Sequence, residues 1–377
     1  MLNTSQELIF TITSLLLSLA CGLACIPYII RFCMKKGLYD MPGARKVHKS
    51  AIPRLGGISF LPSMLLATVI VIAIYSMQNG EGRMHISPWT AGFFLSLLII
   101  YTIGIIDDMA GLGARTKFVA QIIAAAILPL LGLYINNLYG FMGIHELSYI
   151  VGAPLTLFVV VFICNAINLI DGIDGLSAGL SFIALTGFLV CFWQQDMPLY
   201  CILVAGLMGV LLAFLYYNLF GNTEKHQKIF MGDSGSLSLG FILGFLCVKL
   251  SMHNPNVMDY RPDALLQAFT LVIVPVMDVM RVSLVRIRHR TPIFHADKNH
   301  IHHKLMRSGM TQHQALLAIY ALAIGYIALN ALLYKLNMQS TTIVATDVAV
   351  WLAFHQTVNH RIRKAGEPVY LPNPDKD

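Results

Sequence analysis

Long runs of apolar residues follow one another along almost the whole chain. A helix that crosses a bilayer needs about 20 mostly apolar residues. Runs that approach this length lie near residues 8–30, 57–77, 89–106, 116–135, 150–167, 176–193, 198–218, 235–251, 264–281, 314–335 and 341–355. The last run is the weakest, because it is short and Asp347 interrupts it. The pattern predicts an all-α polytopic membrane bundle of about eleven transmembrane helices.

The composition supports a membrane protein and excludes several other classes. Of the 377 residues, 56% are hydrophobic and 12% are charged, whereas a soluble domain has about 25% charged residues. A soluble multi-domain enzyme, a disordered chain and a secreted disulfide-rich scaffold are therefore excluded. The seven cysteines lie in or beside apolar runs without a CxxC pair, so they are interpreted as small apolar residues.

The distribution of lysine and arginine predicts how the helices are oriented. If the N-terminus lies outside, all but four of the 26 basic residues fall in cytoplasmic segments, as the positive-inside rule requires. The C-terminus then lies inside, after eleven spans that form one domain over residues 1–377. Glu7 occupies the place of a positive n-region, so the first run is not expected to be a cleaved signal peptide. The net charge of +7 suits an anionic leaflet and anionic substrates.

Acidic residues collect at the span ends that this orientation places inside. An acid within or beside a transmembrane helix is by default a candidate for function. Proteins hold magnesium with one or two carboxylates together with substrate phosphates. Acids on a basic membrane face therefore predict a divalent cation and bound phosphate groups. These acids are Asp107 and Asp108 after the third span, Asp171 and Asp174 after the fifth, Asp233 before the eighth and Asp278 at the end of the ninth.

Two glycine-containing segments carry the most specific signals. In NAINLIDGIDGL (165–176) polar residues recur every three positions, so neighbouring pairs share a helical face, and the glycines permit a turn or a close approach. In FMGDSGS (230–236) Asp233 and Ser234 are able to cap the next helix, but the flanking glycines favour ligand contact. Phe230 is either a core aromatic or a base-stacking residue. Lys117 either belongs to the acidic site or extends to the membrane interface.

Arginines and histidines follow the ninth predicted span. Histidine-rich tracts bind transition metals in some proteins, but no cysteine accompanies this one and the arginines repel a dication. Recognition of an anion by Arg and His is therefore the better interpretation. The residues are Arg281, Arg286, Arg288, Arg290, His295, Asp297, His300, His302 and His303.

The NxxNxxDGxDGL, DD, GDSGS and HIHH segments together resemble the polyprenyl-phosphate N-acetylhexosamine-1-phosphate transferases. The resemblance covers nearly the whole chain and is strongest to bacterial undecaprenyl-phosphate N-acetylglucosaminyl-1-phosphate transferases, which begin O-antigen and enterobacterial common antigen synthesis. His48-Lys49 with PRLGG (53–57), and DKNHIHH (297–303), favour this branch. Gly111 stands where the branch that transfers phospho-MurNAc-pentapeptide typically has lysine.

The resemblance implies a role for each residue that matches these motifs. It also implies a magnesium cofactor, with manganese as an alternative, and a bacterial inner-membrane location. Catalysis near the lipid phosphate and metal is assigned to Asp107 and Asp108, metal binding to Asp233 and Asn168, and lipid-phosphate binding to Lys117. Nucleotide binding is assigned to Phe230, Asp174 and Asp171, with weaker matches at Arg54 and Lys49. Contact with the sugar or diphosphate is assigned to His300, His302 and His303.

The implied reaction transfers GlcNAc-1-phosphate from UDP-GlcNAc to undecaprenyl phosphate and releases UMP at the cytoplasmic face. A single displacement is favoured, because a phosphate monoester with a second pKa near 6 is largely dianionic at pH 7. Asp107 or Asp108 then removes a residual proton or orients the metal's waters, whereas a covalent route would use one of them as nucleophile.

Other interpretations stay open at this point. The sugar nucleotide is alternatively UDP-GalNAc or UDP-MurNAc-pentapeptide. A secondary transporter is the competing class, but transporters keep charged and broken helices near the bilayer midplane, where only Asp347 is expected. A homodimer is compatible with the sequence, and nucleic acid is not an expected partner.

Overall fold

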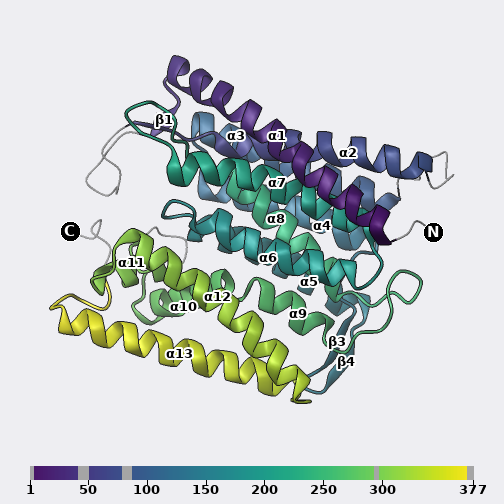
Figure 1. Ribbon diagram of the computed structural model, residues 1–377. Coiled ribbons are helices and arrows are strands. Elements are labelled where there is room, and N and C mark those ends of the chain that lie inside the picture. The colour runs from purple at the N-terminus through teal and green to yellow at the C-terminus, as the bar shows by residue number, and fades with distance from the viewer. Residues whose placement is uncertain (1–3, 41–50, 79–86, 293–296, 372–377) are drawn as a thin grey trace.

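The computed structural model describes residues 4–40, 51–78, 87–292 and 297–371. Long helices run roughly side by side in one bundle (Figure 1), which confirms the predicted all-α class. The helices are α1 (Thr4–Lys36), α2 (Phe60–Gln78), α3 (Pro88–Ala110), α4 (Ala114–Leu130), α5 (Tyr149–Ile170), α6 (Leu176–Trp193), α7 (Pro198–Phe220), α8 (Gly232–Ser251), α9 (Ala264–Leu271), α10 (Ile273–Arg288), α11 (Ile301–Arg307), α12 (Gln312–Lys335) and α13 (Ser340–Lys364).

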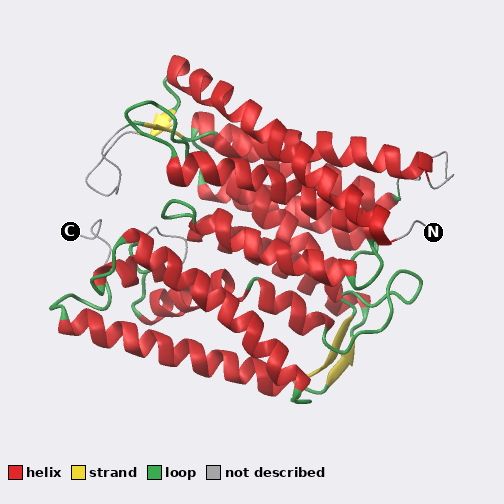
Figure 2. Cartoon of the chain, in the orientation of Figure 1, coloured by secondary structure: helices red, strands yellow, loops and turns green. Residues whose placement is uncertain are grey.

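Short elements lie at the two ends of the bundle. A 3-10 turn, η1 (Gly56–Ser59), precedes α2. Two small antiparallel pairs are present, and Figure 2 shows them at opposite ends of the helices. They are β1 (Tyr39–Asp40) with β2 (Ile52–Pro53), and β3 (Asn137–Phe141) with β4 (Ile144–Glu146).

Most of the predicted spans correspond to helices that meet the requirements for crossing a membrane. In the described ranges eight helices are long and apolar enough, and α9 with α10 makes a ninth if this bent pair is one span. The run predicted over 116–135 is shorter in the structure, because α4 has 17 residues and ends at Leu130. α13 covers the run at 341–355 but is not among the eight. The eleven-span topology and its orientation therefore stay predictions.

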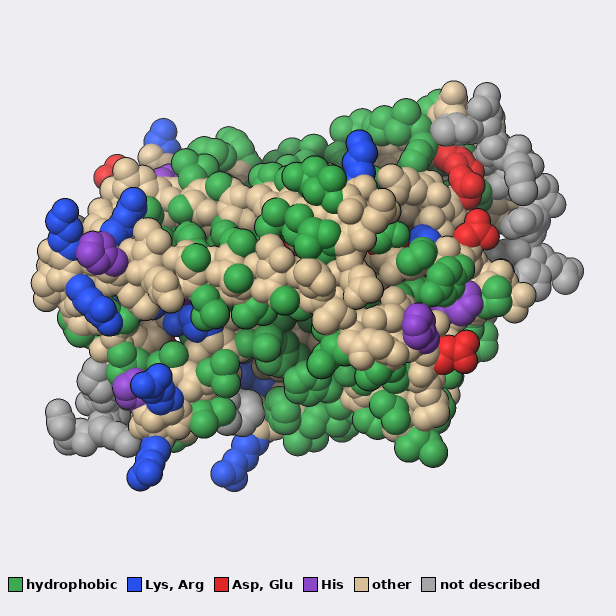
Figure 3. Space-filling model, turned by 90° about the horizontal axis from the view of Figure 1, so that it is seen from below, with side chains coloured by type: hydrophobic (Ala, Val, Ile, Leu, Met, Phe, Trp, Pro, Cys, Tyr) green, Lys and Arg blue, Asp and Glu red, His purple; other side chains and the backbone are tan. Residues whose placement is uncertain are grey.

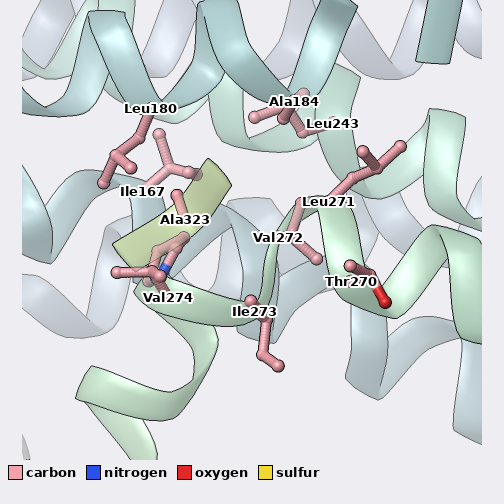
Figure 4. A pocket seen from close by; sticks show the side chains of 11 residues that line it. Ile167, Leu180, Ala184, Leu243, Thr270, Leu271, Val272, Ile273, Val274 and Ala323 are labelled. Atoms are coloured by element: carbon pink, nitrogen blue, oxygen red, sulfur yellow. The ribbon is translucent and has the colours of Figure 1, made fainter. Parts of the chain in front are cut away.

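The candidate span over 264–281 is not one straight helix, because the helix breaks after Leu271 and bends by 71°. Pro275 explains the break: it has no N–H for the Leu271 carbonyl, and its ring crowds that carbonyl. Apolar side chains from several helices surround the break (Figure 4). Because α10 continues to Arg288, Asp278 lies inside this helix and not at the end of a span.

α8 is the central helix, and the most apolar window along it is buried completely. It approaches α5 closely where Gly240 faces Cys164, so that an added Cβ would lie 2.7 Å from the Cys164 Cα. A charge is also buried in α8: the Lys249 ammonium lies 5.1 Å from the Trp89 ring centroid and 5.3 Å from that of Tyr200. Aromatic faces stabilise a cation through their quadrupole. Lys249 is one of the four basic residues outside the predicted cytoplasmic segments, and these aromatic rings accommodate its charge.

The two ends of the bundle differ in charge on the face shown in Figure 3. Most visible Lys and Arg side chains gather at one end, most visible Asp and Glu at the other, and apolar side chains fill the band between them. This face has the charge pattern of a protein whose helices cross a bilayer. We call the two ends the basic end and the acidic end. The basic end contains the termini of α3, α5 and α7 and the starts of α6, α8 and α12 (Figure 1).

A methyl group at Gly209 is expected to weaken the packing of α7 against α1. An added Cβ would lie 2.1 Å from the Leu15 carbonyl oxygen and 2.9 Å from the Leu19 nitrogen, and this backbone cannot yield without moving α1. Gly209→Ala should therefore cost about 1–3 kcal/mol of stability, measured by thermal unfolding in detergent. Gly325→Ala in α12 is the control, since nothing lies within 4 Å of its added Cβ. Equal melting temperatures for the two variants would contradict the close packing.

Candidate active site

Helix termini from four parts of the chain meet at the basic end. α3 ends at Ala110 and is followed by Gly111 with φ of +72°, and α8 begins at Gly232 with φ of +74°. Glycine adopts such angles without steric cost, so the chain turns within one residue at the end of α3 and at the start of α8. The start of α4 and the end of α5 complete the group, because α4 packs on α3 and on α5, and α8 on both α3 and α5. The DD, Lys117, NxxN and GDSGS segments are thereby brought together.

Lys117 joins two of the predicted carboxylates. Its Nζ lies 2.6 Å from Asp233 Oδ2 and 3.0 Å from Asp107 Oδ2. Asn168 completes the group from α5, donating from Nδ2 to Asp233 Oδ1 at 3.0 Å and to Ser236 Oγ at 2.8 Å. Lys117 therefore lies among the acidic residues and contacts two of them, and its role there stays a prediction. If a ligand displaced these contacts, Lys117 could bind an anion, and Asp107 and Asp233 could bind a cation.

Asp108 has a different environment from its neighbour. Its two carboxylate oxygens accept the backbone N–H groups of Asp233 and Ser234 at 2.7 and 2.9 Å, and the residue is only 5% exposed. α8 begins after Met231 without a side-chain cap of its own, so Asp108 caps it from α3. Gly104 makes the approach possible, since a Cβ there would lie 2.5 Å from the Ser234 Cα. The alternative that Asp233 or Ser234 caps α8 is thus wrong.

The PRLGG segment supports the loop that carries Phe230. Phe230 N–H donates to the Pro53 carbonyl at 2.7 Å, and its carbonyl accepts from Gly56 at 2.9 Å. At Gly57 a Cβ would lie 2.1 Å from the Gly235 Cα, so only glycine fits. The Arg54 carbonyl lies close to Gly232, where an added Cβ would be 2.1 Å from its oxygen, whereas His48 and Lys49 lie outside the described residues. The segment fixes the position of Phe230, whose half-buried ring stays the candidate for base stacking.

The DGIDG segment forms a turn between α5 and α6. Gly175 has φ of +77°, and Asn218 Oδ1 accepts its N–H at 2.7 Å. α5 ends at Ile170, so Asp171 and Asp174 lie on the turn and not on the shared helical face that their spacing predicted. Asn168 remains on the helix.

The carboxylates of this turn lie in the field of the other acids. Burial, and then Asp233, Asp174 and Asp108, raise the pKa of Asp171 to about 7. Asp174 instead forms an ion pair with Lys228 at 2.6 Å. Since like charges at close range resist ionisation together, the site has more negative charge than its lysines balance.

Asp278 holds the HIHH segment in place. Its carboxylate is fully buried and lies 2.9 Å from His300 Nδ1 and 2.8 Å from Arg281 Nη2, and it accepts the Ile301 N–H at 3.1 Å. Arg281 also donates to the Asn299 carbonyl at 2.6 Å. α10 therefore sets the direction in which α11 begins.

His302 and His303 are neutral rings near pH 7. Burial, and then His303 and His300, hold the pKa of His302 well below its ordinary value, and burial with neighbouring positive charges lowers the pKa of His303 to about 4. His302 packs on the DGIDG turn, because a Cβ at Gly172 would lie 2.2 Å from its Nε2. These rings suit hydrogen bonding, whereas the sequence interpretation had grouped them with the arginines as recognising an anion.

Two contributors were not singled out from the sequence. Lys228 lies two residues before Phe230 in a short loop, a position from which its pairing with Asp174 could have been anticipated. Gln121 is a single polar residue in the apolar run of α4, and its Oε1 accepts a hydrogen bond from Asn165 Nδ2. Gln121 thus holds Asn165, the first asparagine of the NxxN pair. The described hydrogen bonds include none between Asn165 and Asp233.

The donor set fits a metal ion that arrives with a phosphorylated ligand. In the described part of the chain no three His, Cys, Asp or Glu side chains form a ready metal cage. Magnesium does not need one, because it commonly binds one or two carboxylates, waters and substrate phosphates. Asp233, with Asn168 beside it, supplies that smaller set.

Comparison with known proteins agrees with this arrangement. Residues 90–251 match the model for glycosyl transferase family 4. The probable undecaprenyl-phosphate N-acetylglucosaminyl 1-phosphate transferase of Bacillus subtilis (strain 168) is 33% identical, over 92% of this chain and 88% of that protein. The decaprenyl-phosphate N-acetylglucosaminephosphotransferase of Mycolicibacterium smegmatis is 31% identical over 89% and 85%. The undecaprenyl-phosphate alpha-N-acetylglucosaminyl 1-phosphate transferase of Escherichia coli (strain K12) is 28% identical over 76% and 73%. The chain belongs to the polyprenyl-phosphate N-acetylglucosamine-1-phosphate transferase family.

Proposed function

We propose that this phosphoglycosyl transferase transfers GlcNAc-1-phosphate from UDP-GlcNAc to undecaprenyl phosphate, giving undecaprenyl-diphospho-GlcNAc and UMP. The observation that carries the proposal is the convergence of Asp107, Lys117, Asn168 and Asp233 from four helices at the basic end. One reactant is water-soluble and the other has its chain in the bilayer. A site at the end of membrane-crossing helices is accessible to both, which supports an active site on the cytoplasmic face of the inner membrane.

The excess of carboxylates supports a divalent cation as cofactor. Asp233 and Asn168 are the residues proposed to hold magnesium, with manganese as an alternative. When bound, the ion would neutralise the diphosphate and the departing UMP, as in most phosphoryl transfers. A nearby cation would also lower the pKa of Asp171, which is raised to about 7, because the added positive charge favours the ionised form.

The two adjacent aspartates are proposed to have different roles. Lys117 is proposed to hold the lipid phosphate, whose dianion attacks without needing a strong base. Asp107 contacts Lys117 and is therefore placed to accept a residual proton or to orient water. Asp108 already accepts two backbone N–H groups, so it acts on the reaction by positioning Asp233 and is not available as a nucleophile.

The nucleotide and the sugar are assigned to the neighbouring loops. Phe230 and Asp174, with Asp171, are proposed to bind the nucleotide, and His300, His302 and His303 the sugar or diphosphate. The neutral state of His302 and His303 supports hydrogen bonding to sugar hydroxyls more than ion pairing. Lys228 keeps Asp174 in a fixed position at 2.6 Å.

The finer assignments are also part of the proposal. The relatives described above are named as N-acetylglucosamine phosphate transferases, which supports UDP-GlcNAc over UDP-GalNAc or UDP-MurNAc-pentapeptide as donor. The first membrane step of O-antigen or common antigen synthesis is the proposed place of the reaction. A homodimer is compatible with the bundle and is proposed only as an assembly to be examined.

Magnesium-dependent transfer is the first expected result. Purified protein in detergent should move radiolabelled GlcNAc-1-phosphate from UDP-GlcNAc to undecaprenyl phosphate and release UMP. Asp233→Asn should lower the rate by about 10²-fold or more, because a charge that stabilises the transition state is lost. The donor assignment would be contradicted if folded wild-type protein formed no product with UDP-GlcNAc but formed one with another sugar nucleotide.

Asp108→Asn and Asp107→Asn are expected to differ in a diagnostic way. Asparagine at 108 loses one backbone acceptor, so stability should fall by about 1–3 kcal/mol, and the magnesium concentration for half-maximal rate should rise about 10-fold as Asp233 shifts. Asp107→Asn should reduce turnover with a smaller loss of stability, because Asp107 accepts one backbone N–H, that of Leu112 at 2.6 Å, where Asp108 accepts two. Thermal unfolding and magnesium titration measure both effects. Identical behaviour of the two variants would rule out the division of roles.

A further inference from the structure

A second cavity lies between α6, α9 and α12, away from the acidic site. Its volume is about 630 Å³, within the range of ligand sites, which is about 300–1,000 Å³. We call it the α6–α9–α12 pocket. α6 and α12 are both long and apolar enough to cross a membrane, so we infer that the pocket is open to the hydrocarbon of the bilayer. Its apolar wall includes Phe182, Ile183, Val190, Leu266, Ile324 and Ile327.

The wall of the pocket is held in shape by hydrogen bonds between helices. Asn330, which is 3% exposed, donates from Nδ2 to Thr270 Oγ1 at 2.8 Å and to Asp347 Oδ2 at 3.0 Å. These bonds connect α12 with α9 and α13, so the cavity is a preformed space and not a loose gap. Thr270 and Leu271 also line the small cavity at the α9–α10 break (Figure 4).

The uncommitted polar atoms near the pocket include two acceptors and one donor, the Nε of Arg261, whose charge interacts with Asp263. Asn330 Oδ1 and Asp347 Oδ1 are buried without a partner in the described part of the chain. At the mouth, Asp263 accepts from Gln267 Nε2 at 2.6 Å, and no salt bridge to it is found in the described ranges. Gln194 and Tyr334 line the same rim. A zwitterionic ligand complements this set, because its cationic group donates to the acceptors and its anionic group meets Arg261.

We propose that the α6–α9–α12 pocket binds a membrane phospholipid with an amine head group, such as phosphatidylethanolamine. One hydrocarbon chain would occupy the apolar wall, and the ammonium would lie beside Asp263. An anionic head group without an amine fits less well, because Asp263 repels it. The proposal commits to this occupant because the cavity opens among membrane-crossing helices and has an acid at its mouth.

Native mass spectrometry of the full chain, released from vesicles of equimolar phosphatidylethanolamine and phosphatidylglycerol, tests the proposal. Wild-type protein should retain phosphatidylethanolamine with about a three-fold preference, the size expected for one exposed ion pair. Asp263→Asn should abolish the preference. Asp259→Asn is the matched control, an exposed acid of the same loop that does not line the pocket, and it should keep the preference.

Filling the cavity provides a second, independent variant. Ala331 lines the pocket, and Ala331→Phe should reduce lipid retention several-fold while the melting temperature confirms folding. If Ala331→Phe does not fold, the comparison of Asp263→Asn with Asp259→Asn decides alone. Equal retention of both lipids by wild type, an unchanged preference in Asp263→Asn, or displacement of the bound lipid by undecaprenyl phosphate would each overturn the proposal.

Discussion

The cap that Asp108 provides from α3 is the interaction on which the acidic site depends. The first N–H groups of a helix need partners, and α8 is buried and has no side-chain cap of its own at Met231. Asp108 supplies both acceptors, and one of the N–H groups belongs to Asp233. The same two hydrogen bonds therefore satisfy the first N–H groups of α8 and fix the position of Asp233, whose carboxylate is proposed to bind metal. A displacement of α3 would cost stability and misplace Asp233 together.

The charges of the site form a balance that only a ligand completes. Lys117 bridges Asp107 and Asp233, and Lys228 pairs with Asp174, which leaves Asp108 and Asp171 without an ion pair among the described residues. The raised pKa of Asp171 is the local sign of this excess. The N-terminus of α8 adds a positive dipole that favours anions nearby. A site of this kind accepts a cation and a diphosphate together more readily than either alone.

The sequence predicts the helices well because a membrane-crossing segment must be apolar along its whole length. It fails at Pro275, where one residue inside an apolar run breaks the helix, and at Leu130, where α4 ends early. For the site, the orientation rule predicts that Asp107, Asp108 and Asp233 share one face. It cannot separate Asp107 from Asp108, because neighbouring positions on a helix point about 100° apart and their partners come from distant segments.

The break at Pro275 connects the two parts of the fold that carry charge chemistry. α9 stays beside α12 through Thr270 and Asn330, while α10 turns away by 71° and brings Asp278 against His300. A straight helix could not contact both Asn330 and His300, because the segment after Pro275 would continue along the axis of α9. The orientation of the HIHH segment thus depends on a proline in an apolar run, and the histidines owe their neutrality to the burial that this orientation imposes.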